Sequence, residues 1–226
     1  SYVQMMSKAY EKALTAKKSV VSVTKGAEQE NWNAEATGID ESVSGVIVAD
    51  NGQEILILSY ASICEDAKEW CVTFSDKSEY KASLKKKDKN SGFAIFAVDK
   101  KSLSDATWSA SSVASLGNSN LTEQGDVIFA LGNIFGYAGG SGYGIVSSSN
   151  YKEIGRDGEY SVIATDMSSA SEGTGILFNL DGEVIGMISS DIWKDRGVRT
   201  ANAYAISDLK SVIQLLANGA KVPYIG

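Results

Sequence analysis

Gly125-Asp-Val-Ile-Phe-Ala-Leu-Gly-Asn-Ile-Phe-Gly136 leads through a glycine-rich stretch into Gly142-Tyr-Gly-Ile-Val-Ser-Ser148. Its apolar run Val127–Leu131, bounded by Gly125-Asp126 and Gly132, is typical of a buried strand. The glycines of Gly136-Tyr-Ala-Gly-Gly-Ser-Gly-Tyr-Gly144 resemble a phosphate-binding loop, but no Lys-Ser pair ends them and a strand pattern follows. We therefore predict a β-hairpin here, in which the glycines supply turn conformations with positive φ.

Similar strand signals recur along the chain. Hydrophobic residues make up 43% of the 226 residues, which is enough to fill a core. Short apolar runs alternate with turn signals such as Asp50-Asn-Gly52 at fairly even spacing, which favours a barrel or sandwich over βαβ units. The predicted class is therefore all-β. The runs are 43–48, 55–58, 71–74, 93–98, 127–131 and 183–189.

Three segments together resemble the HtrA family of trypsin-like serine protease domains. The stretch quoted first is similar to the family's Gly-Asn-Pro-x-Gly followed by Gly-Ile-Val-Ser. Gly173-Thr-Gly-Ile-Leu-Phe-Asn-Leu-Asp-Gly-Glu-Val-Ile-Gly-Met187 resembles its nucleophile strand and the hairpin after it. The tail from Ala203-Tyr-Ala-Ile-Ser-Asp-Leu-Lys210 to Val222-Pro-Tyr-Ile-Gly226 resembles the end of its protease domain. With Ser44-Gly-Val-Ile-Val48, the similarity covers roughly residues 18–226.

The resemblance implies a chymotrypsin-like double β-barrel with a terminal α-helix at each end. We expect a helical extension over residues 1–17, a first barrel over 18–110, and a second barrel with the C-terminal helix over 111–226. The Ser-, Ala- and Asn-rich stretch 102–125 is interpreted as the connection between the barrels. In the family a PDZ domain follows this unit, so we expect one in the parent protein.

Helical patterns occur only at the two ends. Leu209, Val212, Ile213 and Leu216 follow helical spacing behind a Ser207 cap, and Asn218-Gly219 ends the pattern. This helix is expected on the second barrel. A weaker stripe over 2–17 comprises Val3, Met6, Tyr10 and Ala13 or Leu14. We predict that it lies on the first barrel, with an oligomer contact as the alternative, since HtrA proteins often form trimers through this region.

The chain contains no histidine, although the family's chemistry needs a His-Asp-Ser triad. By resemblance, the histidine position falls on Ala61 in Leu58-Ser-Tyr-Ala-Ser62, and the aspartate position falls on Gly92 in Gly92-Phe-Ala-Ile95. Counting back from Asn179-Leu-Asp-Gly182 puts the serine on Gly173. Counting forward from Thr165-Asp166 puts it on Thr174, because the loop is one residue shorter. The sequence leaves both choices open.

The flanking positions of the oxyanion loop differ as well. Ser171 replaces a glycine and Glu172 replaces the asparagine before the nucleophile, and an inward-pointing carboxylate would oppose a developing oxyanion. We therefore predict a pseudoprotease without useful peptidase activity. The alternative is an active endopeptidase with a rearranged site that uses Thr174 or a nearby serine. We also expect Tyr60, Phe93 or Thr174 to fill the space left by the lost triad, because unfilled space is costly.

Loss of the triad leaves main-chain peptide binding intact in principle. By resemblance, the substrate-pairing edge corresponds to Ile188-Ser-Ser-Asp-Ile192, which gives Ile188, Ser189, Ser190, Asp191 and the adjacent Trp193 as peptide-binding candidates. Trp193 either shapes a specificity pocket or caps a barrel. The expected partner is an extended or unfolded polypeptide or a partner protein. A third interpretation gives the barrels only a spacing or oligomer-forming role.

The composition argues against several other functions. A net charge of −7 disfavours nucleic acid and anionic lipid, and we interpret the basic run Lys85–Lys89 as a solvated hairpin loop after a strand. Two cysteines, Cys64 and Cys71, allow either a local disulfide or free thiols, and with no histidine a zinc site has almost no support. No cofactor or metal is expected.

No stretch approaches the roughly 20 apolar residues of a membrane span, so any anchor would lie outside this chain. By resemblance, the parent protein is extracytoplasmic, in a bacterial cell envelope or secreted.

Overall fold

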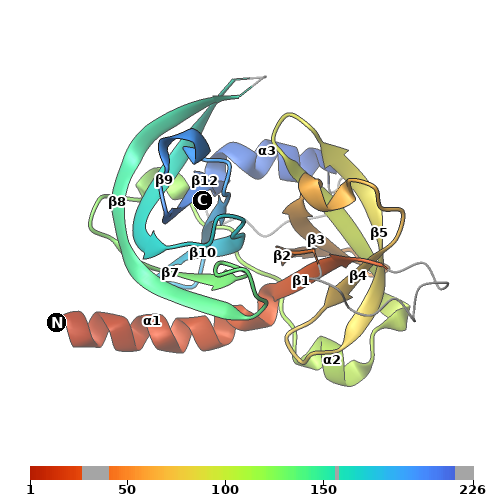
Figure 1. Ribbon diagram of the computed structural model, residues 1–226. Helices are drawn as coiled ribbons and strands as arrows, with labels where there is room; N and C mark the ends of the chain where they lie inside the picture. The colour runs from red at the N-terminus through yellow and green to blue at the C-terminus, as the bar shows by residue number, and fades with distance from the viewer. Residues whose placement is uncertain (27–40, 156–157, 217–226) are drawn as a thin grey trace.

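The computed structural model describes residues 1–26, 41–155 and 158–216, and these form two closed antiparallel barrels of six strands each (Figure 1). In the first barrel the strands neighbour one another in the order β1-β2-β3-β6-β5-β4, and in the second in the order β10-β11-β12-β9-β8-β7. The prediction of an all-β double barrel is therefore confirmed. The first barrel consists of β1 (Val20–Lys25), β2 (Ser42–Asp50), β3 (Glu54–Tyr60), β4 (Trp70–Thr73), β5 (Glu79–Asp88) and β6 (Phe93–Asp99).

The second barrel and the helices complete the described chain. The strands are β7 (Val127–Gly132), β8 (Gly140–Gly155), β9 (Gly158–Ser168), β10 (Gly175–Asn179), β11 (Val184–Ile188) and β12 (Thr200–Ala205). The α-helices are α1 (Tyr2–Ala16), α2 (Asp105–Ser109) and α3 (Ile206–Leu216). Short 3-10 turns are η1 (Lys17–Ser19), η3 (Ala61–Cys64), η4 (Lys100–Ser102), η5 (Ser119–Leu121) and η6 (Lys194–Arg196). None of the described helices is long and apolar enough to cross a membrane.

The hairpin predicted from the glycine-rich stretch is present between β7 and β8. These strands pair antiparallel from Val127 against Ile145 to Gly132 against Gly140. Gly136 and Gly139 in the connecting loop have φ angles of 86° and 78°, a region that a residue with a Cβ atom rarely adopts. The glycines therefore shape a tight loop at the end of the second barrel.

One apolar core cluster spans both barrels and holds them together. It contains Leu58 and Phe93 from the first barrel and Phe129 and Phe178 from the second, all buried. Phe129 and Phe178 stack with their ring centroids 5.0 Å apart, an arrangement that adds to the free energy of burial. Because the shared core continues across the boundary, the two barrels form one packed unit.

Helix α1 lies along the second barrel, so the prediction that it covers the first barrel is wrong (Figure 1). Its buried face consists of Ala9, Ala13 and Ala16, whereas Val3 and Tyr10 from the predicted stripe are 72% and 58% exposed. Alanine allows the helix backbone to approach β7 closely, and larger apolar residues would not fit at that distance. The small residues, not the large ones, mark the packed face.

Helix α3 differs from its prediction in its neighbours and its start. Its buried residues Ile206, Leu209 and Ile213 join the shared core, and it contacts β5 and β6 of the first barrel as well as β11 and β12 of the second. Ser207 lies inside the first turn, where its hydroxyl accepts the Ser119 N–H at 2.9 Å. The predicted end at Asn218-Gly219 lies outside the described residues.

In the first barrel the structure corrects one prediction and decides between two alternatives that the sequence left open. The basic run was expected to be a loop, but Lys85–Asp88 belong to β5 and pair with β6, so the lysines line an outer strand surface. Cys64 is buried against the barrel core, whereas Cys71 alternates with the inward-facing Trp70 and Val72 and faces outward. Both thiols are free. Burial raises the pKa of each thiol, which lowers its reactivity near neutral pH.

Candidate functional site

The residues at the predicted base and acid positions are neighbours in the first barrel, just after β3 and just before β6. The Ala61 N–H donates to the Gly92 carbonyl at 2.9 Å, just beyond the last β3–β6 pair. The Ala61 side chain packs against the first-barrel core, and the following residue, Ser62, is exposed. Neither an alanine nor a serine can accept a proton as imidazole does, so the missing base does not depend on which of them faces the cleft.

Gly173, one of the two candidate nucleophile positions, has no room for a side chain. A Cβ atom built on it would overlap the Ile134 carbonyl oxygen and lie 2.5 Å from Ser169 Oγ. Real side chains do not approach other atoms this closely, so even a serine there would force the loop to move. The loop has closed onto the backbone of the second barrel.

Thr174, the other candidate, points its hydroxyl into the first barrel. Thr174 Oγ1 accepts the Ser44 N–H at 2.9 Å and donates to Ser44 Oγ at 3.1 Å. Ser44 Oγ in turn donates to the Thr174 carbonyl at 3.1 Å and accepts the Asn133 N–H at 2.8 Å. Thr174 is only 8% exposed. Both the donor and the acceptor capacity of the hydroxyl are used inside the protein, so it is not presented to a substrate.

The backbone donors next to these positions are also occupied. Oxyanion stabilisation needs N–H groups aimed at the place where charge develops. Here the Gly173 N–H donates to the Ala170 carbonyl at 3.0 Å, and the Thr174 N–H donates to the Asn133 carbonyl at 3.3 Å. Ser171 and Glu172 are both exposed, so the Glu172 carboxylate points toward solvent and not inward. Because both N–H groups already donate to carbonyl oxygens of the protein, neither is available to a ligand.

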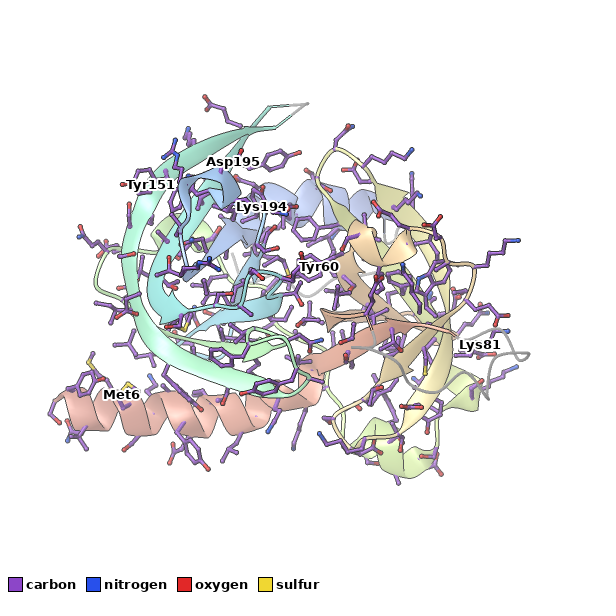
Figure 2. All side chains as sticks on the ribbon, in the orientation of Figure 1. Met6, Tyr60, Lys81, Tyr151, Lys194 and Asp195 are labelled. Atoms are coloured by element: carbon purple, nitrogen blue, oxygen red, sulfur yellow. The ribbon has the colours of Figure 1, made fainter. Side chains whose placement is uncertain are left out.

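Tyr60 lies between the two barrels (Figure 2). Its hydroxyl lies 2.5 Å from the Ile188 carbonyl oxygen and 3.0 Å from the Gly175 carbonyl oxygen, and it accepts the Gly175 N–H at 3.2 Å. Its ring packs against Phe93 at 5.5 Å. Tyr60 and Phe93 therefore pack together as expected, but the space at Gly92 stays open, because a Cβ atom built there would meet no described atom within 4 Å. Complete burial raises the pKa of Tyr60, so the group stays a neutral hydrogen-bonding phenol.

A pocket of about 150 Å³ adjoins the closed loop in the second barrel. It brings together Ser171 and three of the peptide-binding candidates, Ile188, Ser189 and Ser190. The side-chain oxygen of Asn202, another lining residue, is buried without a hydrogen-bond partner among the described residues. The full lining is Ser169, Ala170, Ser171, Ile188, Ser189, Ser190, Ile192, Lys194, Gly197, Val198, Arg199, Thr200 and Asn202.

The predicted peptide-pairing edge is not one extended strand, and this part of the prediction is wrong. Ile188 ends β11, which has partners on both sides in β10 and β12. The Ser189 N–H still donates to the Asn202 carbonyl at 3.0 Å, and the chain then turns, with the Ile192 N–H donating to the Ser189 carbonyl at 3.4 Å. Only the short stretch around Ser190 is left beside the pocket for a peptide main chain.

Asp191 and Trp193 do not line this pocket. Trp193 has a φ of 55° and precedes η6, whose Lys194 and Asp195 are labelled near Tyr151 in Figure 2. The Trp193 ring meets the ring of Tyr151 edge-on at 4.9 Å. This contact connects the loop after β11 to the long strand β8.

Three site residues were not predicted as such: Ser44, Asn133 and Asn202. Ser44 and Asn133 make the hydrogen bonds that draw the loop onto the first barrel. Ser44 and Asn133 both lie in segments that resemble the HtrA family. A polar residue in or next to a buried strand was the sequence feature that could have marked them as hydrogen-bonding residues. Their partners are about 90 to 130 positions away in sequence, so the contacts themselves could not be anticipated.

Two antiparallel six-stranded barrels with a cleft at their junction define the class of two-barrel, chymotrypsin-type protease folds. A family model described as "Trypsin-like peptidase domain" matches residues 43–187. Relatives of the chain are named DegP-like, and such proteins are homologues of the HtrA group. The chain therefore belongs to the trypsin-like peptidase domain family, within its HtrA group.

Similar sequences and a similar structure agree with this assignment. A protein of Pseudomonas savastanoi pv. phaseolicola and one of Halomonas elongata, both named "Probable periplasmic serine endoprotease DegP-like", are 33% and 34% identical over 164 residues. The match covers 72% of this chain but 32% of each relative, so the chain spans about a third of their length. The serine endoprotease of Yersinia pestis has the same fold, with a TM-score of 0.66 at 23% identity over 93% of this chain and 68% of that one.

Proposed function

We propose that this domain is a pseudoprotease that binds extended or unfolded polypeptide, or acts as a regulatory scaffold, without cleaving its partner. The observation that carries the proposal is the absence of histidine from the whole chain, because a hydroxyl nucleophile in this fold depends on an imidazole base. The loop geometry supports the same conclusion independently. The Gly173 and Thr174 N–H groups are bonded to internal carbonyls, and the Thr174 hydroxyl is bonded to Ser44.

The pocket beside the loop supports a binding role. Ser189 and Ser190 lie on its wall, at the end of a strand whose main chain is held rigidly by neighbours on both sides. A rigid wall of this kind can receive a side chain of a bound polypeptide at a low entropic cost. Relatives named as periplasmic endoproteases support an extracytoplasmic location for the parent protein.

Turnover is tested by mass spectrometry after long incubation of the purified chain with casein, beside a Thr174→Ala variant. We expect no fragments from either protein. Fragments that disappear in the variant would identify Thr174 as a nucleophile and support the alternative of a rearranged endopeptidase.

Binding is tested with fluorescently labelled, unfolded casein and measurement of anisotropy. A Ser190→Trp variant places a large ring in the pocket and is expected to weaken binding at least fivefold. Ser83 is exposed on β5 in the other barrel, so Ser83→Trp is the matched control and should bind normally. Equal binding by both variants would show that the pocket beside Ser190 is not the binding site, and no saturable binding by the unsubstituted chain would leave only the spacing role.

A further inference from the structure

A second pocket, which we call the lysine pocket, lies at the junction of the two barrels. Its walls come from the start of β1, the β4–β5 turn, the end of β7 and the β7–β8 loop, and its volume is about 80 Å³. It shares no lining residue with the pocket beside Ser190. Figure 1 shows β1 passing close to the end of the β7–β8 hairpin, where these elements meet.

The lysine pocket is lined by apolar residues and by two lysines. Val20, Val21, Phe74 and Leu131 supply apolar surface, and Lys17 and Lys77 are the charged lining residues. No aspartate or glutamate is among the lining residues. Neither lysine is in an ion pair with another described residue. A small pocket with unpaired positive charge in a protein of net charge −7 favours a carboxylate guest.

The backbone at Lys77 has a conformation that is uncommon for a residue with a side chain. Lys77 has a φ of 74° in the β4–β5 turn, where glycine or asparagine would be free of strain. Its Nζ lies 3.9 Å from where a Cβ atom of Gly139 would be, so it reaches across to the other barrel. Asp76 does not compete for this ammonium group, since its carboxylate accepts Thr107 Oγ1 at 2.7 Å and the Ser78 N–H at 3.0 Å.

Exposed rings beside the pocket favour a polypeptide over a small carboxylate. Phe135 and Tyr137 in the β7–β8 loop are 37% and 61% exposed, and their ring centroids are 6.0 Å apart. Both rings lie next to Gly140, a lining residue of the lysine pocket. Exposed aromatic rings offer contact area to apolar residues of a partner at low entropic cost. A free small carboxylate would leave this surface unused.

We propose that the lysine pocket binds a glutamate side chain of an acidic, extended polypeptide segment. The methylene stem of the glutamate occupies the apolar part of the pocket, and its carboxylate pairs with Lys77 and Lys17. Apolar residues on either side of the glutamate contact Phe135 and Tyr137. This site is separate from the one in the proposed function and does not depend on it.

Three N-acetylated peptides test the ligand chemistry by amide chemical shifts of the isotope-labelled chain. The probe is acetyl-Ala-Val-Glu-Val-Ala amide, and the same peptide with Gln in place of Glu removes only the charge. We expect the Glu peptide to shift the amide signals of Gly139, Gly140 and Ser22, and the Gln peptide to bind at least tenfold more weakly. Raising the salt concentration should weaken the Glu peptide further.

The third peptide separates two sources of carboxylate. It is acetyl-Ala-Val-Gln-Val-Ala with a free terminal carboxylate, and we expect it to bind as weakly as its amide. Equal binding of this peptide and the Glu peptide would overturn the assignment to a glutamate side chain. Lys194 and Arg199 line the other pocket, so shifts confined to residues 188–202 would place the acidic peptide there and overturn the proposal.

Variants of Lys77 separate binding from folding. Lys77→Gln is expected to weaken the Glu peptide about tenfold, and Lys101→Gln, an exposed lysine on η4, should leave it unchanged. Lys77→Gly removes the charge and also relieves the positive φ, so its melting temperature should rise while binding falls. Unchanged binding by Lys77→Gly and Lys77→Gln would contradict the proposal.

Discussion

At the residue scale, the Tyr60 hydroxyl links the two barrels where a protease would carry out its chemistry. Tyr60→Phe removes the partner of the Gly175 N–H and of two buried carbonyls, so we expect a loss of about 2 kcal/mol in the free energy of unfolding. Urea denaturation measures this loss. Tyr10→Phe, at an exposed tyrosine on α1, is the control and should change stability by less than about 0.5 kcal/mol. An equally small effect at Tyr60 would mean that the hydroxyl bonds contribute nothing net.

The same residue predicts how stability depends on alkaline pH. Burial raises the pKa of Tyr60 in the folded state above its ordinary value of 10.0. Above pH 10 the unfolded chain therefore releases this proton while the folded protein keeps it. The contribution of Tyr60 to the free energy of unfolding is thus fully present below pH 10 and falls as the pH rises beyond it. The slope from this group is at most about 1.4 kcal/mol per pH unit. The difference in stability between the parent chain and Tyr60→Phe should therefore shrink between pH 10 and pH 11, and a constant difference would contradict burial of an un-ionised phenol.

At the element scale, the face of α1 that packs against β7 is made of alanines. Ala9 has no exposed surface, so Ala9→Leu adds volume where none is free, and we expect a loss of about 1–3 kcal/mol. The neighbouring Tyr10→Leu, on the exposed face, should have little effect. Thermal unfolding of both variants measures the contrast. Equal melting temperatures would show that α1 does not pack as described.

The same helix shows what the sequence pattern could and could not predict. Apolar spacing predicted the existence of α1 and α3, because period and caps are local properties. Of the predicted stripe only Ala13 is buried, whereas Val3 and Tyr10 are exposed, because close approach to β7 requires a small side chain. The basic run in β5 was misassigned for a similar reason. Strand pairing with β6 outweighs the preference of consecutive lysines for a loop.

At the scale of the whole molecule, the candidate site depends on contacts between the two barrels, and local sequence patterns do not predict such contacts. Absence of the base could be inferred from the sequence alone, since it needs only a count of histidines. Closure of the loop could not, because Ser44 and Thr174 are 130 positions apart and meet only when both barrels have folded. If the domain is inactive as we propose, the cause is spread over three features: the missing base, the nucleophile position and the N–H groups next to it.

This distribution makes a prediction about restoring the chemistry. Ala61→His, Gly92→Asp and Gly173→Ser together supply the three side chain types, yet a serine at 173 would overlap the Ile134 carbonyl oxygen. The N–H groups of residues 173 and 174 would still donate to Ala170 and Asn133, and loss of one oxyanion donor costs about 100- to 1,000-fold in rate. We expect that a fluorophosphonate reagent does not label the triple variant covalently. Mass spectrometry measures the labelling, and trypsin is the positive control. The result should be the same for a second triple variant in which histidine replaces Ser62 and Ala61 is kept. Labelling at residue 173 would show that the loop opens readily and that the closed loop is no barrier to the chemistry.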